Sequence, residues 1–160
     1  MGIRPSTAVV FDINVYLDYI LGDDGSWPTV PTPPPPTTGN ASADAIALAF
    51  TDRFRLFASP HILRNVHEKM LAAGQSIRIA NEFVRLIVDI CDFSGGAVVD
   101  PVVSDAGIRD YEDSRILALA KDKTADADII VSRDSDLLRI GPVWNGRLIL
   151  PPREFVQHAM

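Results

Sequence analysis

The sequence predicts an α/β fold in which a parallel sheet of four to five strands is flanked by helices on both faces. Short apolar runs rich in β-branched residues recur along the chain, which is typical of buried strands. Segments with the 3.6-residue spacing of amphipathic helices separate these runs, so helical crossovers are expected to join parallel strands. The chain has 160 residues and is 47% apolar and 22% charged, which is enough for one domain with a hydrophobic core.

The N-terminal part of the chain carries the first strand and a proline-rich segment. Residues 8–11 (AVVF) are expected to form a short buried strand that ends at Asp12, and residues 14–21 a short helix. Residues 22–40 include six prolines, which lack amide donors and favour polyproline II. We therefore expect a proline-rich surface insertion at about 22–40, within a single domain that spans residues 1–160.

The middle of the chain is expected to be mainly helical. Ser59 should cap a helix, because the next residue is a proline suited to the first helical position, and Gly74 should end that helix. The elements expected here are helices at 43–50, 60–73 and 76–90 and a brief strand at 56–58.

The last third of the chain alternates strands with helices. Asp110 is the expected N-cap of a helix with an acidic first turn, and Asp113 occupies the third position of that helix. Asn145 and Gly146 are expected to form a turn before the last strand. The expected strands lie at 97–99, 128–132 and 147–150, and the expected helical segments lie at 111–120, 135–138 and 152–159.

The charge composition restricts the classes of function. Lys and Arg number 15 against 21 Asp and Glu, and the formal net charge of −6 argues against a broad phosphate-binding surface. Seventeen of the acids are Asp and 12 of the bases are Arg, residue types suited to hard-cation ligation and to bidentate phosphate contacts. The sequence shows no membrane span and no signal-peptide pattern, and Cys91 reads as a small buried hydrophobe. We therefore expect a cytoplasmic protein.

Several acidic residues are expected at the carboxyl ends of the strands, where ligands bind in open α/β sheets. These residues are Asp12 after the first strand, Asp134 and Asp136 after the strand at 128–132, and Asp113 in the first turn of the helix at 111–120. Carboxylates gathered at one edge repel one another unless a cation binds, and hard oxygens are the ligands of Mg²⁺ or Mn²⁺. Each acid alone also suits a turn, a cap or a helix start, so only their joint placement predicts a metal site.

Four segments of the sequence together resemble the PIN-domain nuclease family, which includes VapC-type toxins of bacterial toxin–antitoxin pairs. They are VVFDINVYLDY, SPHILRNVHEKM, DYEDSRILALA and ADIIVSRDSDLL, and the likeness extends over about residues 8–150. The resemblance implies a PIN-like α/β fold. It also implies Mg²⁺ or Mn²⁺ held by Asp12, Asp113 and Asp134, with Asp136 nearby.

The same resemblance implies an activity and partners. The implied substrate is RNA, cleaved at its phosphodiester bonds, and toxin members of the family commonly form homodimers and bind a small antitoxin protein. Asn14 and Ser132 match the family pattern and would orient the carboxylates or a water on the metal. Arg133, Arg115 and Arg109 are candidate phosphate contacts, and surface solubility or helix pairing explains them at least as well.

One position departs from the family pattern. The family usually carries a glutamate on the helix that follows Ser59, and in this chain Asn65 occupies that position. Glu68 lies about one helical turn farther along and is the other candidate for the acidic position, although a glutamate there is more often part of a solvated helix face. If neither residue serves, the site has one acid fewer and binds a metal ion more weakly.

Two other functions remain open at this point. A PIN-fold binding module with weakened catalysis is favoured by Asn65 and disfavoured by the retained aspartates. A phosphatase of the haloacid dehalogenase type is suggested by VVFDIN, but Asn14 replaces the second aspartate, which such an enzyme needs as its general acid. In addition, no lysine occurs between Met70 and Lys121, where the phosphate clamp of such an enzyme is expected. The metal-dependent ribonuclease is therefore preferred.

Overall fold

The strands of the molecule form one sheet whose order is β3-β2-β1-β4-β6-β5. The computed structural model describes residues 2–20, 40–51, 53–101 and 111–159, without the side chains of residues 20 and 111–113. The strands in these ranges are β1 (Ala8–Phe11), β2 (Arg55–Ala58), β3 (Ala97–Val98), β4 (Ile129–Val131), β5 (Val143–Trp144) and β6 (Arg147–Leu150). The expected proline-rich insertion lies outside the described residues, apart from Asn40 at its end.

The pairing of the strands places β1 at the centre of a mainly parallel sheet. β1 pairs in parallel with β2 and β4, so that Val9 lies opposite Leu56 on one side and Ile129 on the other. β6 continues the parallel sheet beside β4, and β5 pairs antiparallel with β6. The predicted α/β class and parallel sheet are confirmed, but the described sheet has six strands rather than four to five. The additional strand is β5, which has only two residues and therefore too short a pattern to be recognised in the sequence.

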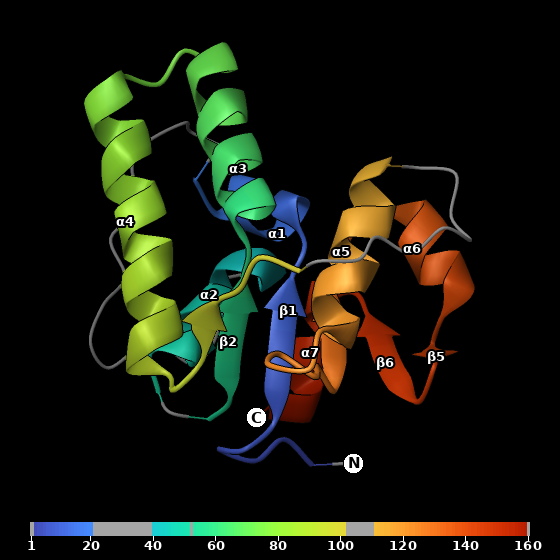
Figure 1. The fold of residues 1–160 in the computed structure, drawn as a ribbon. Coiled ribbons are helices and arrows are strands. Elements are labelled where there is room, and N and C mark those ends of the chain that lie inside the picture. The colour runs from blue at the N-terminus through green and yellow to red at the C-terminus, as the bar shows by residue number, and fades with distance from the viewer. Residues whose placement is uncertain (1, 21–39, 52, 102–110, 160) are drawn as a thin grey trace.

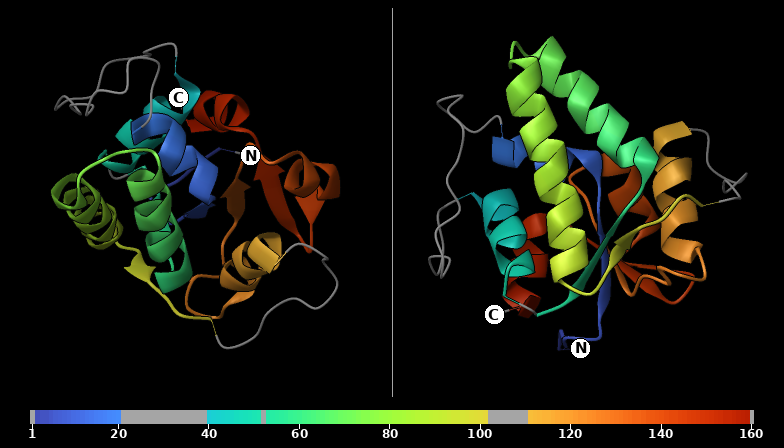
Figure 2. Two further views of the ribbon diagram at one scale, coloured as in Figure 1. Left: turned by 90° about the horizontal axis from the view of Figure 1, so that it is seen from above. Right: turned by 60° about the vertical axis from the view of Figure 1, so that its left-hand side comes forward.

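Helices cover both faces of this sheet, as predicted. The helices are α1 (Ile13–Ile20), α2 (Ala41–Ala49), α3 (Pro60–Ala72), α4 (Ile77–Phe93), α5 (Tyr111–Lys121), α6 (Ser135–Ile140) and α7 (Pro152–Ala159). Figures 1 and 2 show α3, α4 and α5 on one side of the sheet and α2 and α7 on the other. The α3–α4 hairpin rises well beyond the carboxyl ends of the strands (Figure 1), and α1 begins at the same edge directly after β1.

The helix boundaries follow local capping chemistry. Ser59 accepts a hydrogen bond from the amide of Ile62 at 3.2 Å and caps α3, as predicted. Ser76 caps α4 in the same way, through the amide of Ile79. α4 continues to Phe93, three residues beyond the expected end, because Cys91 extends the buried stripe of the helix.

An aromatic cluster lies directly beneath the carboxyl end of β1. The ring of Phe11 lies 5.7 Å from that of Phe155, 5.9 Å from that of Phe54 and 5.8 Å from that of Tyr16, measured between centroids. All four side chains are fully buried. Because Phe11 is the last residue of β1, this aromatic cluster fixes the position at which the backbone leaves the sheet. In the part of the chain that the structure describes, no helix is both long and apolar enough to cross a membrane.

Candidate functional site

Asp12 lies where β1 ends and α1 begins. Its amide donates to the carbonyl of Val131 at 2.9 Å, and its own carbonyl accepts from the amide of Val15 at 3.0 Å. Its carboxylate turns back onto the helix start, where Oδ1 accepts from the amide of Ile13 at 2.7 Å. The residue is only 6% exposed. Asp12 is therefore a fixed, nearly buried carboxylate at the carboxyl edge of the sheet.

Ser132 brings the end of β4 to the same place. This serine is fully buried, and its amide donates to the carbonyl of Leu150 in β6 at 3.0 Å. Its hydroxyl donates to Asp12 Oδ2 at 2.7 Å and accepts from the amide of Asp134 at 2.9 Å. Because β1 and β4 are adjacent and parallel, their carboxyl ends meet, and Ser132 links the two aspartates across that junction.

Asn14 forms a second link across the junction. Its side-chain amide donates to Asp12 Oδ2 at 3.4 Å, a long contact, and its carbonyl oxygen accepts from the amide of Arg133 at 3.1 Å. The guanidinium of Arg133 turns towards α1 and forms an ion pair with Asp18. Asn14 and Ser132 thus contact the carboxylate of Asp12 from α1 and from the end of β4.

The two aspartates after β4 have different surroundings. Asp134 caps α6, because its Oδ1 accepts from the amide of Asp136 at 2.8 Å. The side chain of Asp136 is 63% exposed and lies 3.5 Å from a guanidinium nitrogen of Arg139. The structure therefore joins Asp134 to Asp12 through Ser132, whereas Asp136 pairs with a basic residue at the solvent-facing side of α6.

The predicted contribution of α5 rests on its backbone position. α5 runs beside β1, and its first turn lies towards the carboxyl edge of the sheet (Figure 1). Asp113 belongs to this first turn, but its side chain lies outside the described residues, as do Asp110 and Arg109 entirely. Arg115 is described and half-buried. The role of Asp113 therefore stays a prediction.

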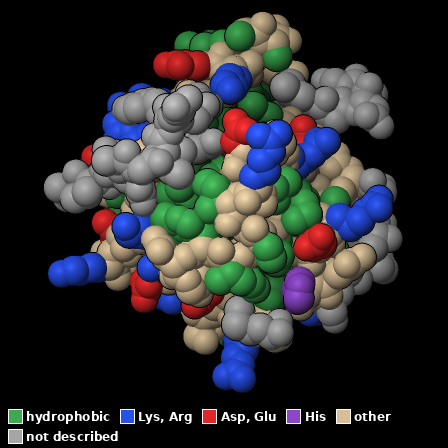
Figure 3. All heavy atoms as spheres, turned by 90° about the vertical axis from the view of Figure 1, so that its right-hand side faces the viewer, with side chains coloured by type: hydrophobic (Ala, Val, Ile, Leu, Met, Phe, Trp, Pro, Cys, Tyr) green, Lys and Arg blue, Asp and Glu red, His purple; other side chains and the backbone are tan. Residues whose placement is uncertain are grey.

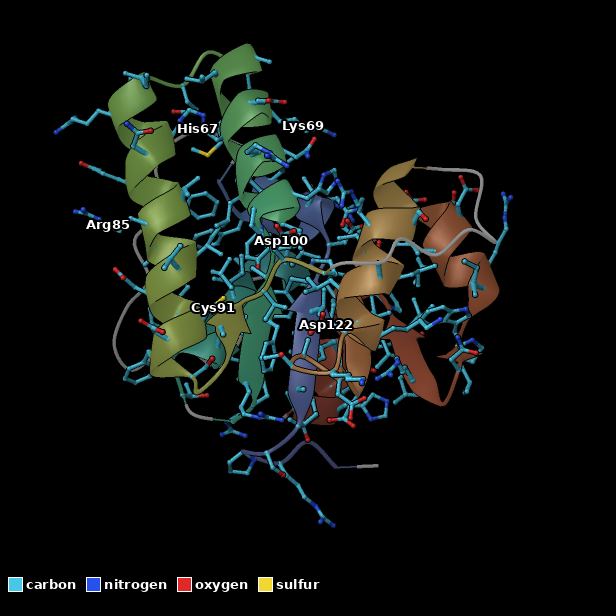
Figure 4. All side chains as sticks on the ribbon, viewed as in Figure 1. His67, Lys69, Arg85, Cys91, Asp100 and Asp122 are labelled. Atoms are coloured by element: carbon cyan, nitrogen blue, oxygen red, sulfur yellow. The ribbon has the colours of Figure 1, made fainter. Side chains whose placement is uncertain are left out.

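α3 carries the two candidates for the family's usual glutamate. Asn65 is half-buried, and its side-chain amide donates to the carbonyl of His61 at 2.8 Å. Glu68 is exposed. Lys69, one turn beyond Asn65, extends from α3 towards α5, whereas His67 lies on the side of α4 and contacts Asn81 at 2.8 Å (Figure 4). Asn65 and Lys69, four residues apart on one side of α3, thus bring an amide and an ammonium group rather than a carboxylate.

Two acidic residues near this edge were not among the predicted site residues. Asp100 lies two residues after the end of β3, so the same rule about strand ends could have found it. β2 separates β3 from β1, which keeps Asp100 two strands away from Asp12 (Figure 4). Asp18 had a weaker signal, namely its position four residues after Asn14, on the same side of α1.

The donor groups of the site suit a hard divalent cation. Asp12 and Asp134 offer carboxylate oxygens, and Asn14 and Ser132 offer neutral oxygens beside them, which is the ligand chemistry of Mg²⁺ and Mn²⁺. Among the side chains that the structure describes, no three His, Cys, Asp or Glu residues form a metal-binding group. A metal site at this edge would therefore need a third carboxylate beside those of Asp12 and Asp134, and Asp113 is the predicted one.

Charges of both signs surround this edge. Figure 3 shows acidic and basic side chains next to each other towards the top of the face that it presents, with hydrophobic side chains below them. The described part of this face does not carry a broad basic surface. Binding of a polyanionic ligand would therefore depend on a few individual arginines and on a cation, in agreement with the net charge of −6.

Comparison with known proteins identifies the family. The family model for the PIN domain matches residues 8–136, which include β1, β4 and every predicted metal ligand. The chain belongs to the PIN-domain family. PIN domains are generally nucleases, so membership favours a nuclease-type function over a phosphatase of the haloacid dehalogenase type. No curated protein and no solved structure matches this PIN domain.

Proposed function

We propose that this PIN domain is a metal-dependent ribonuclease that hydrolyses phosphodiester bonds in RNA. The observation that carries the proposal is the contact of the nearly buried Asp12 with Ser132, whose hydroxyl also accepts the amide of Asp134. Two acids from distant parts of the sequence thus follow adjacent parallel strands at one edge of the sheet, which supports a metal site there. The fold alone would allow many activities, so the argument rests on this arrangement.

The residues that would hold Mg²⁺ or Mn²⁺ are Asp12, Asp134 and Asp113, with Asp136 nearby. A bound divalent cation supplies a water of lowered pKa and neutralises negative charge on the phosphate. Ser132 and Asn14 orient the carboxylate of Asp12, because both contact its Oδ2. The acids themselves repel a phosphodiester, and the cation removes that repulsion.

The nuclease activity can be tested with the full chain. We expect cleavage of a labelled single-stranded RNA of mixed sequence in Mn²⁺ or Mg²⁺, and no cleavage in excess EDTA. Asp12→Asn and Asp113→Asn should each lower the rate by about a hundredfold or more, corresponding to about 2.7 kcal/mol of transition-state stabilisation. DNA of the same sequence should be cleaved more slowly if the substrate is RNA.

A matched variant controls for the loss of one negative charge. Asp126 is an exposed aspartate that pairs with Arg147 at 3.0 Å, near the opposite end of β4. Asp126→Asn should leave RNA cleavage unchanged. Equal rates for the wild-type chain and Asp12→Asn, or metal-independent cleavage, would contradict the proposal.

We also propose that the chain is the toxin component of a toxin–antitoxin pair. The support is its resemblance to VapC-type toxins, which implies a homodimer and a small antitoxin protein as partner. Induced expression in a bacterial host should arrest growth, and the variant Asp12→Asn should not. Light scattering of the purified chain should give the mass of a dimer; normal growth of the host on expression of the active protein would count against the toxin role.

The alternative of a binding module with weakened catalysis rests on Asn65. A neutral amide in place of a carboxylate lowers the negative charge of the site, and this amide is engaged with the carbonyl of His61. The module would bind Mn²⁺ and RNA without cleaving any of a broad set of RNAs. That result, with binding lost in Asp12→Asn, would favour the module over the nuclease.

A further inference from the structure

Arg133 lies between the proposed catalytic edge and the second turn of α1. Resting on the proposed function, we propose that Arg133 binds the phosphate next to the scissile one in a single-stranded RNA, and that Asp18 is the positioning residue for its guanidinium. The substrate class is therefore an RNA with at least two consecutive phosphates. The assignment rests on the contacts that hold both residues.

The backbone of Arg133 is fixed at the site, and its side chain leads away from it. Its amide donates to Asn14 Oδ1 at 3.1 Å, and Asn14 in turn contacts the carboxylate of Asp12. Its Nη1 atom forms an ion pair with Asp18 Oδ2. Asn14 and Asp18 are four residues apart and share one side of α1, so Arg133 lies along that side.

Asp18 is itself held from α2. The hydroxyl of Ser42, a buried residue, donates to Asp18 Oδ2 at 3.4 Å. The side-chain amide of Asn40 donates to the carbonyl of Asp18 at 3.3 Å, while its side-chain oxygen caps α2. Asp18 is 31% exposed, compared with 59% for Arg133. The carboxylate is therefore the better-anchored member of the pair and sets the direction of the arginine.

The N–H donors of Arg133 that do not contact Asp18 are suited to bind a phosphate. A guanidinium has five N–H donors, and the described contacts of this side chain use only Nη1 towards Asp18. One edge can bind a carboxylate while another binds phosphate oxygens. An exposed ion pair contributes little to stability, so orientation of the guanidinium is the better explanation for the anchored Asp18.

The position of Asp18 separates this contact from the scissile phosphate. Asp18 is six residues beyond Asp12, which is about 9 Å along the axis of α1 at a rise of about 1.5 Å per residue. A phosphate bound by the guanidinium beside Asp18 is thus displaced from a phosphate held at Asp12 and Asp134. In a polynucleotide, the group at that place is the neighbouring phosphate.

Two other arginine–acid pairs of the described surface lie away from the carboxyl edge of the sheet. Arg78 and Glu82 are 4.0 Å apart within α4, with 81% and 55% of their side chains exposed. Arg147 pairs with Asp126 near the opposite edge of the sheet, where the carbonyl of Ala127 also accepts from Arg147. These pairs serve as comparisons, because neither lies near the carboxyl edge.

The test compares two substrates that differ in the neighbouring phosphate. One is a single-stranded RNA oligonucleotide, and the other is a dinucleoside monophosphate, which has only the scissile phosphate. In the full chain with Mn²⁺, Arg133→Ala should raise KM for the oligonucleotide by about tenfold, and the effect on the dinucleoside should be several times smaller. Asp18→Asn should raise KM for the oligonucleotide by about threefold, with kcat within about twofold.

Binding provides a second readout that does not require cleavage. Each phosphate contact to a single strand contributes about 0.7 to the slope of log K against log salt. Arg133→Ala should reduce that slope by about this amount in anisotropy measurements with the labelled oligonucleotide. Arg53→Ala and Asp126→Asn are matched controls, since Arg53 donates to the carbonyl of Ala159 on another part of the surface and Asp126 pairs with Arg147.

The possible outcomes are distinct. If Arg133→Ala raises KM equally for the oligonucleotide and the dinucleoside monophosphate, the arginine lies at the scissile phosphate and the inference is overturned. If Arg133→Ala raises KM for the oligonucleotide and Asp18→Asn leaves it unchanged, the positioning role of Asp18 is overturned. Failure of the wild-type chain to cleave either substrate would reject the proposed nuclease, and an unchanged salt slope in Arg133→Ala would then reject the phosphate contact as well.

Discussion

The hydroxyl of Ser132 donates to the carboxylate of Asp12 at 2.7 Å, although 120 positions separate the two residues in the sequence. This bond joins the carboxyl ends of β4 and β1, and the same hydroxyl accepts the amide of Asp134. Ser132 is fully buried, so water does not replace its hydrogen bonds when the side chain is removed. One hydroxyl group therefore connects the carboxylate of Asp12 with the backbone of Asp134.

Ser132→Ala should weaken metal binding and RNA cleavage by about 10- to 100-fold, because the supporting bond to Asp12 is lost. Isothermal titration with Mn²⁺ and the Mn²⁺ dependence of cleavage measure the two effects. Ser135→Ala removes an exposed hydroxyl in the first turn of α6 and is the matched control. Unaltered Mn²⁺ affinity in Ser132→Ala would show that the hydroxyl does not support the site.

Variants of α3 test whether Asn65 or Glu68 occupies the acidic position of the site. Glu68 is exposed, so Glu68→Gln should change the cleavage rate by less than about twofold. Asn65→Glu should tighten Mn²⁺ binding if position 65 adjoins the acids, because an added carboxylate attracts the cation. The measurement is the Mn²⁺ concentration for half-maximal cleavage. A tenfold loss in Glu68→Gln would instead assign the acidic role to Glu68.

Gly96 should be one of the least replaceable residues of the fold. A Cβ atom at this position would lie 1.8 Å from the carbonyl oxygen of Leu56, which is backbone and cannot move aside cheaply. Gly96→Ala should therefore lower the free energy of unfolding by roughly 1–3 kcal/mol, as overpacked sites do. Urea denaturation measures this change, with Gly2→Ala as the control, since nothing lies within 4 Å of a Cβ there. Equal stability of the two variants would contradict the expectation.

Stability should fall at alkaline pH. Burial raises the pKa of Cys91 from 9.0 to about 12, with a smaller contribution from Asp92, and burial also raises the pKa of Tyr19 from 10.0 to about 12. The unfolded chain releases these protons above about pH 9 while the native state retains them, so the free energy of unfolding decreases as pH rises towards 12. Burial likewise raises the pKa of Tyr16.

Denaturation with urea at several values between about pH 8 and about pH 11 measures this decrease. Cys91→Ala should make the free energy of unfolding depend less steeply on pH, because one of the titrating groups is then absent. The native thiol should also react slowly with iodoacetamide near neutral pH and rapidly after unfolding. Rapid alkylation of the native protein would show that Cys91 is accessible.

The strands and helices could be predicted because their signals are local. Ser59 and Ser76 cap helices at the positions where Ser precedes a helical pattern, and the valines of β1 form a short β-branched run that is typical of a buried strand. β5 could not be predicted in this way. Its two residues are held by pairing with β6, which is a tertiary contact rather than a pattern in the sequence.

The site was less accessible to sequence reasoning than the fold. Position after a strand suggested Asp12 and Asp134, and the family resemblance added Ser132 and Asn14. The link from Arg133 to Asp18 could not be inferred, because it depends on the direction of a flexible side chain and on support from Ser42 in α2. Asp100 also lies after a strand, so its signal in the sequence is of the same kind as that of Asp12.

The central position of β1 has a consequence for the order in which the protein is made. On the ribosome the first strand emerges long before its neighbour β4, and at about 5–20 residues per second the intervening 120 residues take roughly 6–24 s to synthesise. Until then Asp12 lacks the serine that orients it. The carboxyl edge at Asp12 therefore takes its final form only after β4 has been synthesised and has paired with β1.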